Sequence, residues 1–308
     1  MRLKIRKMVI KMTGKQKKEW KRNAIGYSFI LPNFIGYFIF IFVPVILTFV
    51  LCVMKWDGSS TPMEFVGLKN FVKLFHDSGF RISVTNTLYY AVFTVPLTMV
   101  AALLIAVLLN SKIKGIVVYR TAFFFPYVAS LVAVGAVWNM LFQPEFGPVN
   151  EFLKFIGIAN PPKWCASTDW AMTVIIIVSV WKYMGYYVVI YSSGLLSISD
   201  TYYEAAKVDG AGRIRCFFSI TLPMLKPTII LAVFLSLTNS LRCFDLIFNL
   251  TGGGPNNATT TLVLYAYSSC FGSSKAGYAM AISNMLFLVV LVIALMQRTL
   301  MRRDVSEL

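Results

Sequence analysis

Residues 25–54 read IGYSFILPNFIGYFIFIFVPVILTFVLCVM and carry no charged side chain. The run is longer than the roughly 20 apolar residues that cross the hydrocarbon core of a bilayer. It is also far longer than the apolar core of a secretory signal peptide, and no small-residue cleavage pattern follows it. We therefore expect this stretch to remain in the protein as a first membrane helix.

The rest of the chain repeats this apolar character. Of its 308 residues, 57% are hydrophobic and 14% charged, whereas soluble domains average roughly 45–50% apolar residues. This composition excludes a water-soluble fold. Polar or Pro/Gly-rich stretches separate six apolar segments, at about residues 25–54, 83–110, 121–142, 171–198, 227–249 and 277–297. The sequence predicts an all-α integral membrane protein with about six transmembrane helices, kinked around a cavity by Pro32, Pro44, Pro96 and Pro126.

Lysine and arginine are distributed unevenly. Of the 29, ten precede Asn23, and counting alternate loops places 20 on one side of the membrane and seven on the other. Because positive residues are retained on the cytoplasmic face, both termini are predicted to be cytoplasmic. The net charge of +16 is also compatible with nucleic acid, but a basic arm leading directly into an apolar span is typical of membrane topology, so no nucleic-acid partner is expected. The predicted organisation is a basic cytoplasmic arm (1–22), a membrane domain (23–300) and a cytoplasmic tail (301–308).

Residues 199–223, SDTYYEAAKVDGAGRIRCFFSITLP, form the predicted cytoplasmic loop between the fourth and fifth apolar segments. Ser199 or Asp200 can cap a first short helix, and Gly210 can end it. A second helical segment then runs until Pro223 stops it. We expect a compact helix-turn-helix element on the inner face of the membrane.

The side chains of this loop favour contact with another protein. Ala205 and Ala206 allow close approach, Glu204 offers a charge, and Phe217 and Phe218 offer apolar anchors. An ordinary amphipathic loop at the membrane interface accounts for the same composition. Composition alone leaves both interpretations open.

The spacing of this loop resembles the EAA loop of ABC importer permeases. Glu204-Ala205-Ala206 is followed by Gly210 and then by Ile220-Thr-Leu222-Pro223. In that family the loop is a coupling helix that sits in a cleft of the cytoplasmic ATPase. The resemblance therefore implies a coupling role for Glu204, Ala205, Ala206, Asp209, Gly210, Ile220, Leu222 and Pro223.

Similarity extends over roughly residues 25–300. Motifs that resemble the carbohydrate-uptake subfamily are Phe65-Val-Gly-Leu-Lys-Asn-Phe71, Asn86-Thr-Leu88, Phe125-Pro-Tyr127, Phe146-Gly-Pro-Val-Asn150, Phe244-Asp-Leu-Ile247 and Thr251-Gly-Gly-Gly-Pro255. Within it the chain resembles the first of two permeases, the maltose-permease-F, raffinose or multiple-sugar type. It lacks the additional N-terminal spans and large periplasmic insertion of the enterobacterial maltose protein, and looks closer to the shorter six-span type.

The resemblance implies an ABC type I importer permease fold and a full set of partners. These are a second homologous permease, a dimer of cytoplasmic ABC ATPases, an extracytoplasmic solute-binding protein, a sugar that is carried, and the lipid of the bacterial cytoplasmic membrane. ATP and Mg would bind the ATPase, so this chain is expected to need no cofactor and to be no enzyme. Transport would proceed by alternating access.

Two polar stripes lie inside predicted spans, where charges are costly and usually face a cavity or a partner. Lys182 shares a helical face with Ser179, Tyr186 and Ser193. Hydroxyl hydrogen bonds and ring stacking commonly hold sugars, and Tyr183 and Tyr187 add further rings to this stripe.

The second stripe has Asn239, Arg242, Asp245 and Asn249 at intervals of three or four. The residues predicted to line the substrate path are Ser179, Lys182, Tyr183, Tyr186, Tyr187, Asn239, Arg242 and Asp245. Packing between helices, or against the second permease, also accounts for both stripes, and Arg242 and Asp245 can simply neutralise each other. A neutral oligosaccharide is the expected cargo, although Lys182 and Arg242 would also suit an anion.

Other classes of protein find less support in the chain. An intramembrane enzyme needs converging catalytic groups, but the one histidine is His76, in a predicted outer loop, and no HExxH motif occurs. The scattered cysteines form no CxxC pair, so neither a metal site nor a disulfide framework is predicted. Gly252-Gly-Gly-Pro255 is not followed by Lys-Ser/Thr, which argues against a phosphate-binding loop. A channel or ion-coupled carrier remains the alternative, but would not need a docking loop.

Overall fold

The computed structural model describes residues 14–110 and 115–306, and they are almost entirely helical. Much of the predicted basic arm (1–13), Lys112 and Lys114 in the next predicted cytoplasmic loop, and the last two residues of the predicted tail (307–308) lie outside the described residues. The chain divides into two compact units at Leu51. The proposed boundaries at residues 22 and 300 stay predictions.

The first unit is the predicted first membrane helix. It consists of α1 (Gly14–Tyr37), a π-helical segment η1 (Phe38–Phe42) and α2 (Val43–Leu51), whose last residue begins the second unit. The apolar helix Lys18–Leu51 is long enough to span a bilayer. The wide π turn ends at Phe42, two residues before Pro44, which has no N–H to donate to the preceding turn. Helical structure therefore continues past this proline.

The second unit is a helical assembly with one small hairpin. Its elements are β1 (Met54–Lys55), β2 (Glu64–Phe65), α3 (Lys69–His76), α4 (Ser78–Leu109), α5 (Ile116–Val128), α6 (Leu131–Leu141), α7 (Pro148–Phe155), the 3-10 turn η2 (Trp164–Ala166), α8 (Ala171–Leu196), α9 (Asp200–Val208), α10 (Arg213–Cys216), the π segment η3 (Phe217–Thr221), α11 (Leu222–Met224), α12 (Lys226–Leu241), α13 (Asp245–Leu250), α14 (Leu262–Tyr267), the π segment η4 (Ser268–Gly272) and α15 (Ala276–Ser306). The strands β1 and β2 pair antiparallel.

The described part of the chain contains four unbroken apolar helices long enough to cross a membrane and two bent pairs, giving six spans if each pair crosses once. The bent pairs are Ile116–Val128 with Leu131–Leu141, at 96°, and Arg213–Met224 with Lys226–Leu241, at 67°. The six predicted spans are confirmed in this sense.

Two of the expected spans differ from the prediction in detail. The segment 121–142 breaks after Val128, because Ala129 and Ser130 adopt extended backbone geometry. The segment 227–249 breaks after Leu241, and the Cys243 carbonyl accepts a hydrogen bond from Thr261 Oγ1 at 3.0 Å instead of continuing the helix. Both breaks depend on contacts outside the local sequence.

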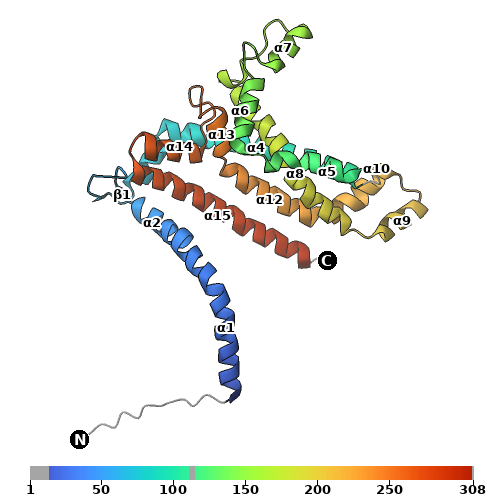
Figure 1. Ribbon diagram of the computed structural model, residues 1–308, viewed down its shortest axis with the longest axis horizontal. Helices are drawn as coiled ribbons and strands as arrows, with labels where there is room; N and C mark the ends of the chain where they lie inside the picture. Colours follow the sequence, from blue (N-terminus) through green and yellow to red (C-terminus); the bar gives the residue numbers. More distant parts are fainter. Residues whose placement is uncertain (1–13, 111–114, 307–308) are drawn as a thin grey trace. The chain divides into compact units, whose positions relative to one another are not determined.

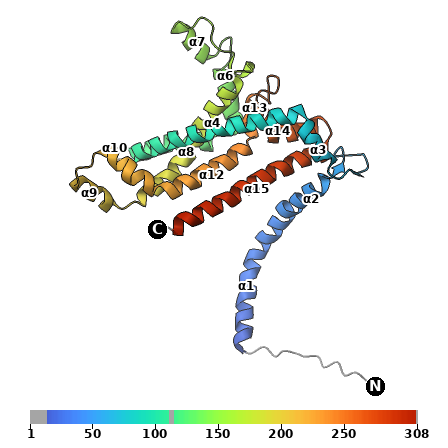
Figure 2. The same cartoon turned by 180° about the vertical axis from the view of Figure 1, so that it is seen from behind.

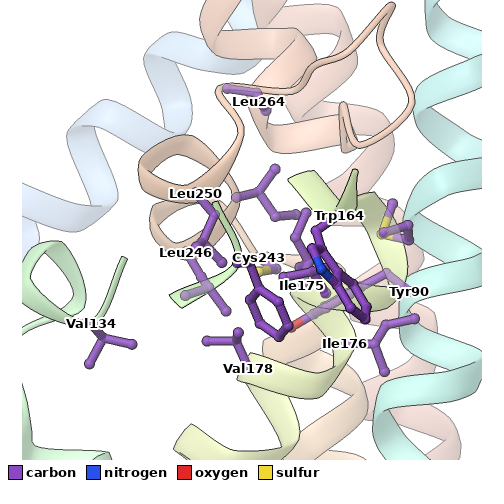
Figure 3. Packing of buried hydrophobic residues seen from close by; sticks show 14 residues of the cluster. Tyr90, Val134, Trp164, Ile175, Ile176, Val178, Cys243, Leu246, Leu250 and Leu264 are labelled. Carbon is purple, nitrogen blue, oxygen red and sulfur yellow. The ribbon is translucent and has the colours of Figure 1, made fainter. Parts of the chain in front are cut away.

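Helix α8 occupies the centre of the second unit (Figures 1 and 2) and packs against α4 and α5, while α12 packs against α4 and α15. One buried cluster joins α4, α8 and α13 through Tyr90, Ile175, Val178 and Leu246 (Figure 3). A second cluster joins α4 and α8 nearer to α9 and includes Met99. These two clusters hold α4 against α8 at two separate places along their length.

Two asparagines from the motifs quoted above fix turns. The Asn86 amide donates to the carbonyls of Asn257 (2.8 Å) and Thr260 (3.1 Å), which tie α4 to the glycine-rich turn before α14. The Asn150 side chain is buried and accepts from Trp164 Nε1 at 2.5 Å. A buried amide with several partners is costly to replace. These two residues are thus structural.

Asp77 joins three helices at one end of α4. Its side chain caps α4 by accepting from the Gly79 amide at 2.9 Å, and it also accepts from Tyr265 (2.6 Å) on α14 and from Tyr278 on α15. Burial raises the pKa of the Asp77 carboxyl, but the tyrosine and amide hydrogen bonds outweigh it, so the net pKa lies below its usual value.

The lowered pKa of Asp77 predicts an acid-sensitive contribution to stability. A carboxyl whose pKa is lower in the folded state stabilises the fold above its unfolded pKa of about 4, and loses this contribution as the pH falls through the folded value. Asp77→Asn should therefore lower the free energy of unfolding at neutral pH by about 1–2 kcal/mol, and with it the thermal midpoint, and this deficit should shrink below about pH 4. Thermal unfolding in detergent from pH 7 to 3 tests this, and a deficit independent of pH would contradict it.

Candidate functional site

The predicted helix-turn-helix loop is present. Ser199 Oγ caps α9 by accepting from the Thr201 amide at 3.3 Å, as its position suggested. Gly210 has a φ of +73°, a left-handed conformation that glycine adopts at little cost, and it follows the end of α9. The second helical segment begins at Arg213, as expected, and ends at Met224, one residue past the expected stop at Pro223. Because the π segment η3 directly precedes α11, Pro223 falls in the first turn of that helix, where no N–H is needed, and the chain bends only at Leu225.

The loop presents apolar side chains to its surroundings. Val208 and Ile214 are 89% and 77% exposed, and Phe218 is also largely exposed, whereas Phe217 is half-buried. Glu204 and the neighbouring Ala205 are also exposed, and they lie on α9 together with Val208. Several exposed apolar side chains on one short loop favour a contact with protein or membrane. The coupling role of the eight residues named above stays a prediction.

A cavity of about 380 Å³ lies among α4, α5, α8, α12 and the start of α13. This volume is within the range that small-molecule sites occupy. Its lining is rich in tyrosine rings and aliphatic hydroxyls and includes one amide side chain. The lining residues are Tyr90, Thr94, Thr98, Tyr127, Tyr183, Tyr186, Tyr187, Ser236, Asn239, Ser240, Arg242, Cys243, Phe244, Asp245 and Leu246.

Aromatic rings form one wall of the cavity. The Tyr127 ring stacks on that of Tyr186, with centroids 4.9 Å apart and planes at 21°. Tyr183 meets Tyr127 edge-on at 6.5 Å, and Tyr187 meets Tyr186 edge-on at 5.1 Å. Flat apolar faces beside phenol hydroxyls give a surface that offers both stacking and hydrogen bonds.

Two hydroxyls on α4 lack partners at this cavity. Thr94 and Thr98 are 3% and 1% exposed, and their Oγ1 atoms make no hydrogen bond within the protein. Buried polar atoms are nearly always paired, because an unpaired one costs about 1–3 kcal/mol. Both residues border the cavity, although their hydroxyl oxygens have almost no exposed surface in this structure.

Six of the eight residues predicted for the substrate path line the cavity, and two do not. Ser179 instead accepts from Tyr90 at 2.9 Å in the buried core. Lys182 is 2% exposed, and its ammonium donates to the backbone carbonyls of Pro126 and Ala129, at 3.0 and 2.8 Å. Ser179 and Lys182 thus make the kind of packing contacts that the alternative explanation described, and the substrate path itself stays a prediction.

The second predicted stripe does not lie on one helix, since the chain breaks between α12 and α13. Arg242 is exposed and donates to the Thr238 carbonyl at 3.3 Å and to Asn239 Oδ1 at 3.5 Å. The ion pairs within the described residues are Lys55–Glu64 and Lys154–Glu151, so the alternative in which Arg242 and Asp245 neutralise each other as an ion pair is not seen.

Several cavity residues were missed in the sequence. Thr94 and Thr98 stand four residues apart in an apolar run, so helical spacing alone could have paired them. Ser236 and Ser240, also four apart, extend the polar face of Asn239 by the same rule. Tyr127 follows Pro126 in a quoted motif, but its place depends on the bend after α5.

Comparisons with known proteins agree with this architecture. A model of the family described as binding-protein-dependent transport system inner membrane component matches residues 71–303. The lactose transport system permease protein LacF of Rhizobium radiobacter is 34% identical over 88% of this chain and 92% of its own length. The trehalose/maltose transport system permease protein MalF of Thermococcus litoralis is 33% identical over 89% and 92%.

A solved structure is also similar. It is a bacterial alginate ABC transporter in complex with an alginate pentasaccharide-bound periplasmic protein, one chain of which superposes with a TM-score of 0.81 at 26% identity, over 93% of this chain and 97% of that chain. The fold is thus that of an ABC type I importer permease, and the chain belongs to the binding-protein-dependent transport system inner membrane component family.

Proposed function

We propose that this chain is a permease subunit of an ATP-driven importer that moves an oligosaccharide across the bacterial cytoplasmic membrane. The observation that carries the proposal is the cavity, where stacked tyrosine rings lie beside the unpartnered hydroxyls of Thr94 and Thr98. A sugar presents apolar ring faces and many hydroxyls, which this lining complements. The family likeness makes the chain a transporter subunit and not an enzyme, with ATP hydrolysis carried out by a separate chain.

A neutral sugar is the cargo that the cavity favours. Lys182, one of the two cations that would suit an anion, is buried against carbonyls and does not line the cavity. Arg242 lines it, but so does the carboxylate of Asp245. The relatives LacF and MalF are named for lactose and for trehalose/maltose, which supports the same class. The alginate transporter keeps an acidic oligosaccharide as the second candidate.

Coupling to the ATPase is assigned to α9 and the turn after it. Glu204 and the apolar side chains Val208, Ile214 and Phe218 of the same loop are all exposed, and a partner cleft would remove them from water. ATP and Mg bind the partner ATPase in this proposal. Closure of the two ATPases rocks this permease against a second, homologous permease and opens the cavity alternately to each side, while an extracytoplasmic solute-binding protein delivers the sugar.

The cavity hydroxyls give a direct test of the cargo site. Thr94→Val/Thr98→Val replaces each unpartnered hydroxyl with a methyl group of similar size. Without cargo, removal of unpaired buried hydroxyls should leave the thermal midpoint unchanged or raise it. With cargo, two lost hydrogen bonds should raise the KM for uptake about 10-fold or more. Uptake of labelled lactose, maltose, trehalose and alginate oligosaccharides into proteoliposomes holding the complete transporter measures this.

Ser192→Ala is the matched control. The Ser192 hydroxyl is also buried and unpartnered, but the residue does not line the cavity, so its replacement should leave KM unchanged. If the double variant transports every sugar of the panel with unaltered KM, the cavity is not the sugar path. If only alginate oligosaccharides are carried, the neutral-sugar assignment is replaced by the acidic one.

A further inference from the structure

The bend between α5 and α6 leaves backbone carbonyls without helical partners. Helix α5 ends at Val128, and Ala129 and Ser130 are extended before α6 begins. The Ala129 amide still donates to Phe125 at 3.2 Å, but α5 does not continue beyond this point. The last carbonyls of a helix lack intrahelical donors and form the negative end of its dipole.

One side chain gathers these carbonyls. Lys182 Nζ lies 3.0 Å from the Pro126 carbonyl, 3.4 Å from that of Tyr127 and 2.8 Å from that of Ala129. An ammonium group has three protons to donate, so the three acceptors use its full capacity. Neither ion pair within the described residues includes Lys182. The partner of this buried cation is therefore the end of a helix.

Helix α8 approaches α5 closely enough for this contact because of Gly185. A Cβ at Gly185 would collide with the backbone of Phe123 and Phe124. The lysine lies less than one turn before this glycine on α8. The bend is thus held against α8 at two neighbouring points, one by close backbone contact and one by the ammonium.

The carbonyls that Lys182 binds belong to Tyr127, whose ring lines the cavity, and to residues on either side of it. Lys182 donates to the carbonyl of Tyr127 itself and to that of the preceding Pro126. The Tyr127 ring lines the cavity and stacks on Tyr186, which lies one turn after Lys182 on α8. Helix α8 therefore determines both the backbone and the ring position of Tyr127.

We propose that Lys182 is a positioning residue: its ammonium fixes the bend between α5 and α6 and so sets the Tyr127 ring in the wall of the cavity, without touching cargo. The effect on sugar affinity rests on the proposed function, whereas the position of Tyr127 does not. Removing the ammonium frees three carbonyls and allows the segment that carries Tyr127 to move.

The experiment places a fluorinated tyrosine at position 127 in the complete transporter, in nanodiscs, and records its ¹⁹F spectrum. The parent protein should give one dominant resonance. Lys182→Met, similar in shape but uncharged, should broaden or split it, and Lys182→Arg, which keeps charge and donors, should restore it at least in part. A second reporter at Tyr191, farther along α8 and buried, should not change. Lys154→Met removes a surface lysine paired with Glu151 and is the control.

An unchanged Tyr127 resonance in Lys182→Met would overturn the proposal, as would equal changes at Tyr127 and Tyr191. If Lys182→Met does not fold, Lys182→Gln, which keeps two donors without the charge, decides the same question. KM for the sugar carried best should rise about 10-fold in Lys182→Met. A changed resonance with unaltered KM upholds the positioning role and instead contradicts the assignment of the cavity to cargo.

Discussion

Glu204→Lys should reduce sugar uptake about 100-fold or more while leaving the permease folded. Glu204 is exposed on α9 and forms neither of the two ion pairs within the described residues, so its reversal should change the stability of the isolated chain by less than about 0.5 kcal/mol. At a docked interface, a reversed charge that was paired costs about 2–5 kcal/mol. Uptake, ATPase activity and co-purification of the ATPase with the permease would all be measured.

Glu19→Lys supplies the matched control for this charge reversal. Glu19 is also an exposed carboxylate and lies in α1, in the predicted cytoplasmic arm. Its replacement should leave uptake within about twofold of the parent protein, because a surface charge outside an interface contributes little. If Glu204→Lys transports as well as Glu19→Lys, α9 is not the coupling element. If uptake falls but the ATPase still co-purifies, α9 transmits motion without providing the binding energy.

The local structure of the coupling loop could be predicted because its signals are local. A capping hydroxyl at Ser199 and a glycine at Gly210 act on the residues beside them, and the structure has both in the expected roles. The end of the second segment, one residue past Pro223, depends on more than local signals. Whether a proline ends a helix depends on the turn before it, and the π segment there has no clear sequence signal.

The cavity could be predicted only in part, because helical spacing gives a face of a helix but not what that face meets. Tyr186 and Asn239 were placed on polar faces, and both line the cavity. Lys182 was assigned to the same face, yet its partners are carbonyls at the end of α5, more than 50 positions away in sequence. The spacing of apolar residues along the sequence does not predict the bend after Val128 that leaves those carbonyls free.

Gly185→Val should have the largest effect on the fold among single substitutions in α8. Real Cβ atoms do not approach other heavy atoms as closely as a Cβ at Gly185 would approach the Phe123 carbonyl, and the atoms concerned belong to the backbone of α5. Flexible side chains can move aside, but here one helix must move. Overpacking of this kind costs about 1–3 kcal/mol or more, so we expect a lower yield of folded protein and a lower thermal midpoint.

The same substitution also separates stability from transport. Pushing α5 away from α8 lengthens the contacts of Lys182 and moves Tyr127 off Tyr186, so uptake should fall further than the loss of folded protein explains. Gly26→Val is the control, because a Cβ at Gly26 in α1 meets no atom within 4 Å. Thermal unfolding and uptake per folded transporter would be compared for both variants. Equal behaviour of the two would show that α5 and α8 do not approach as closely as described. The contact at Gly185 would then not explain the position of Tyr127 in the cavity wall.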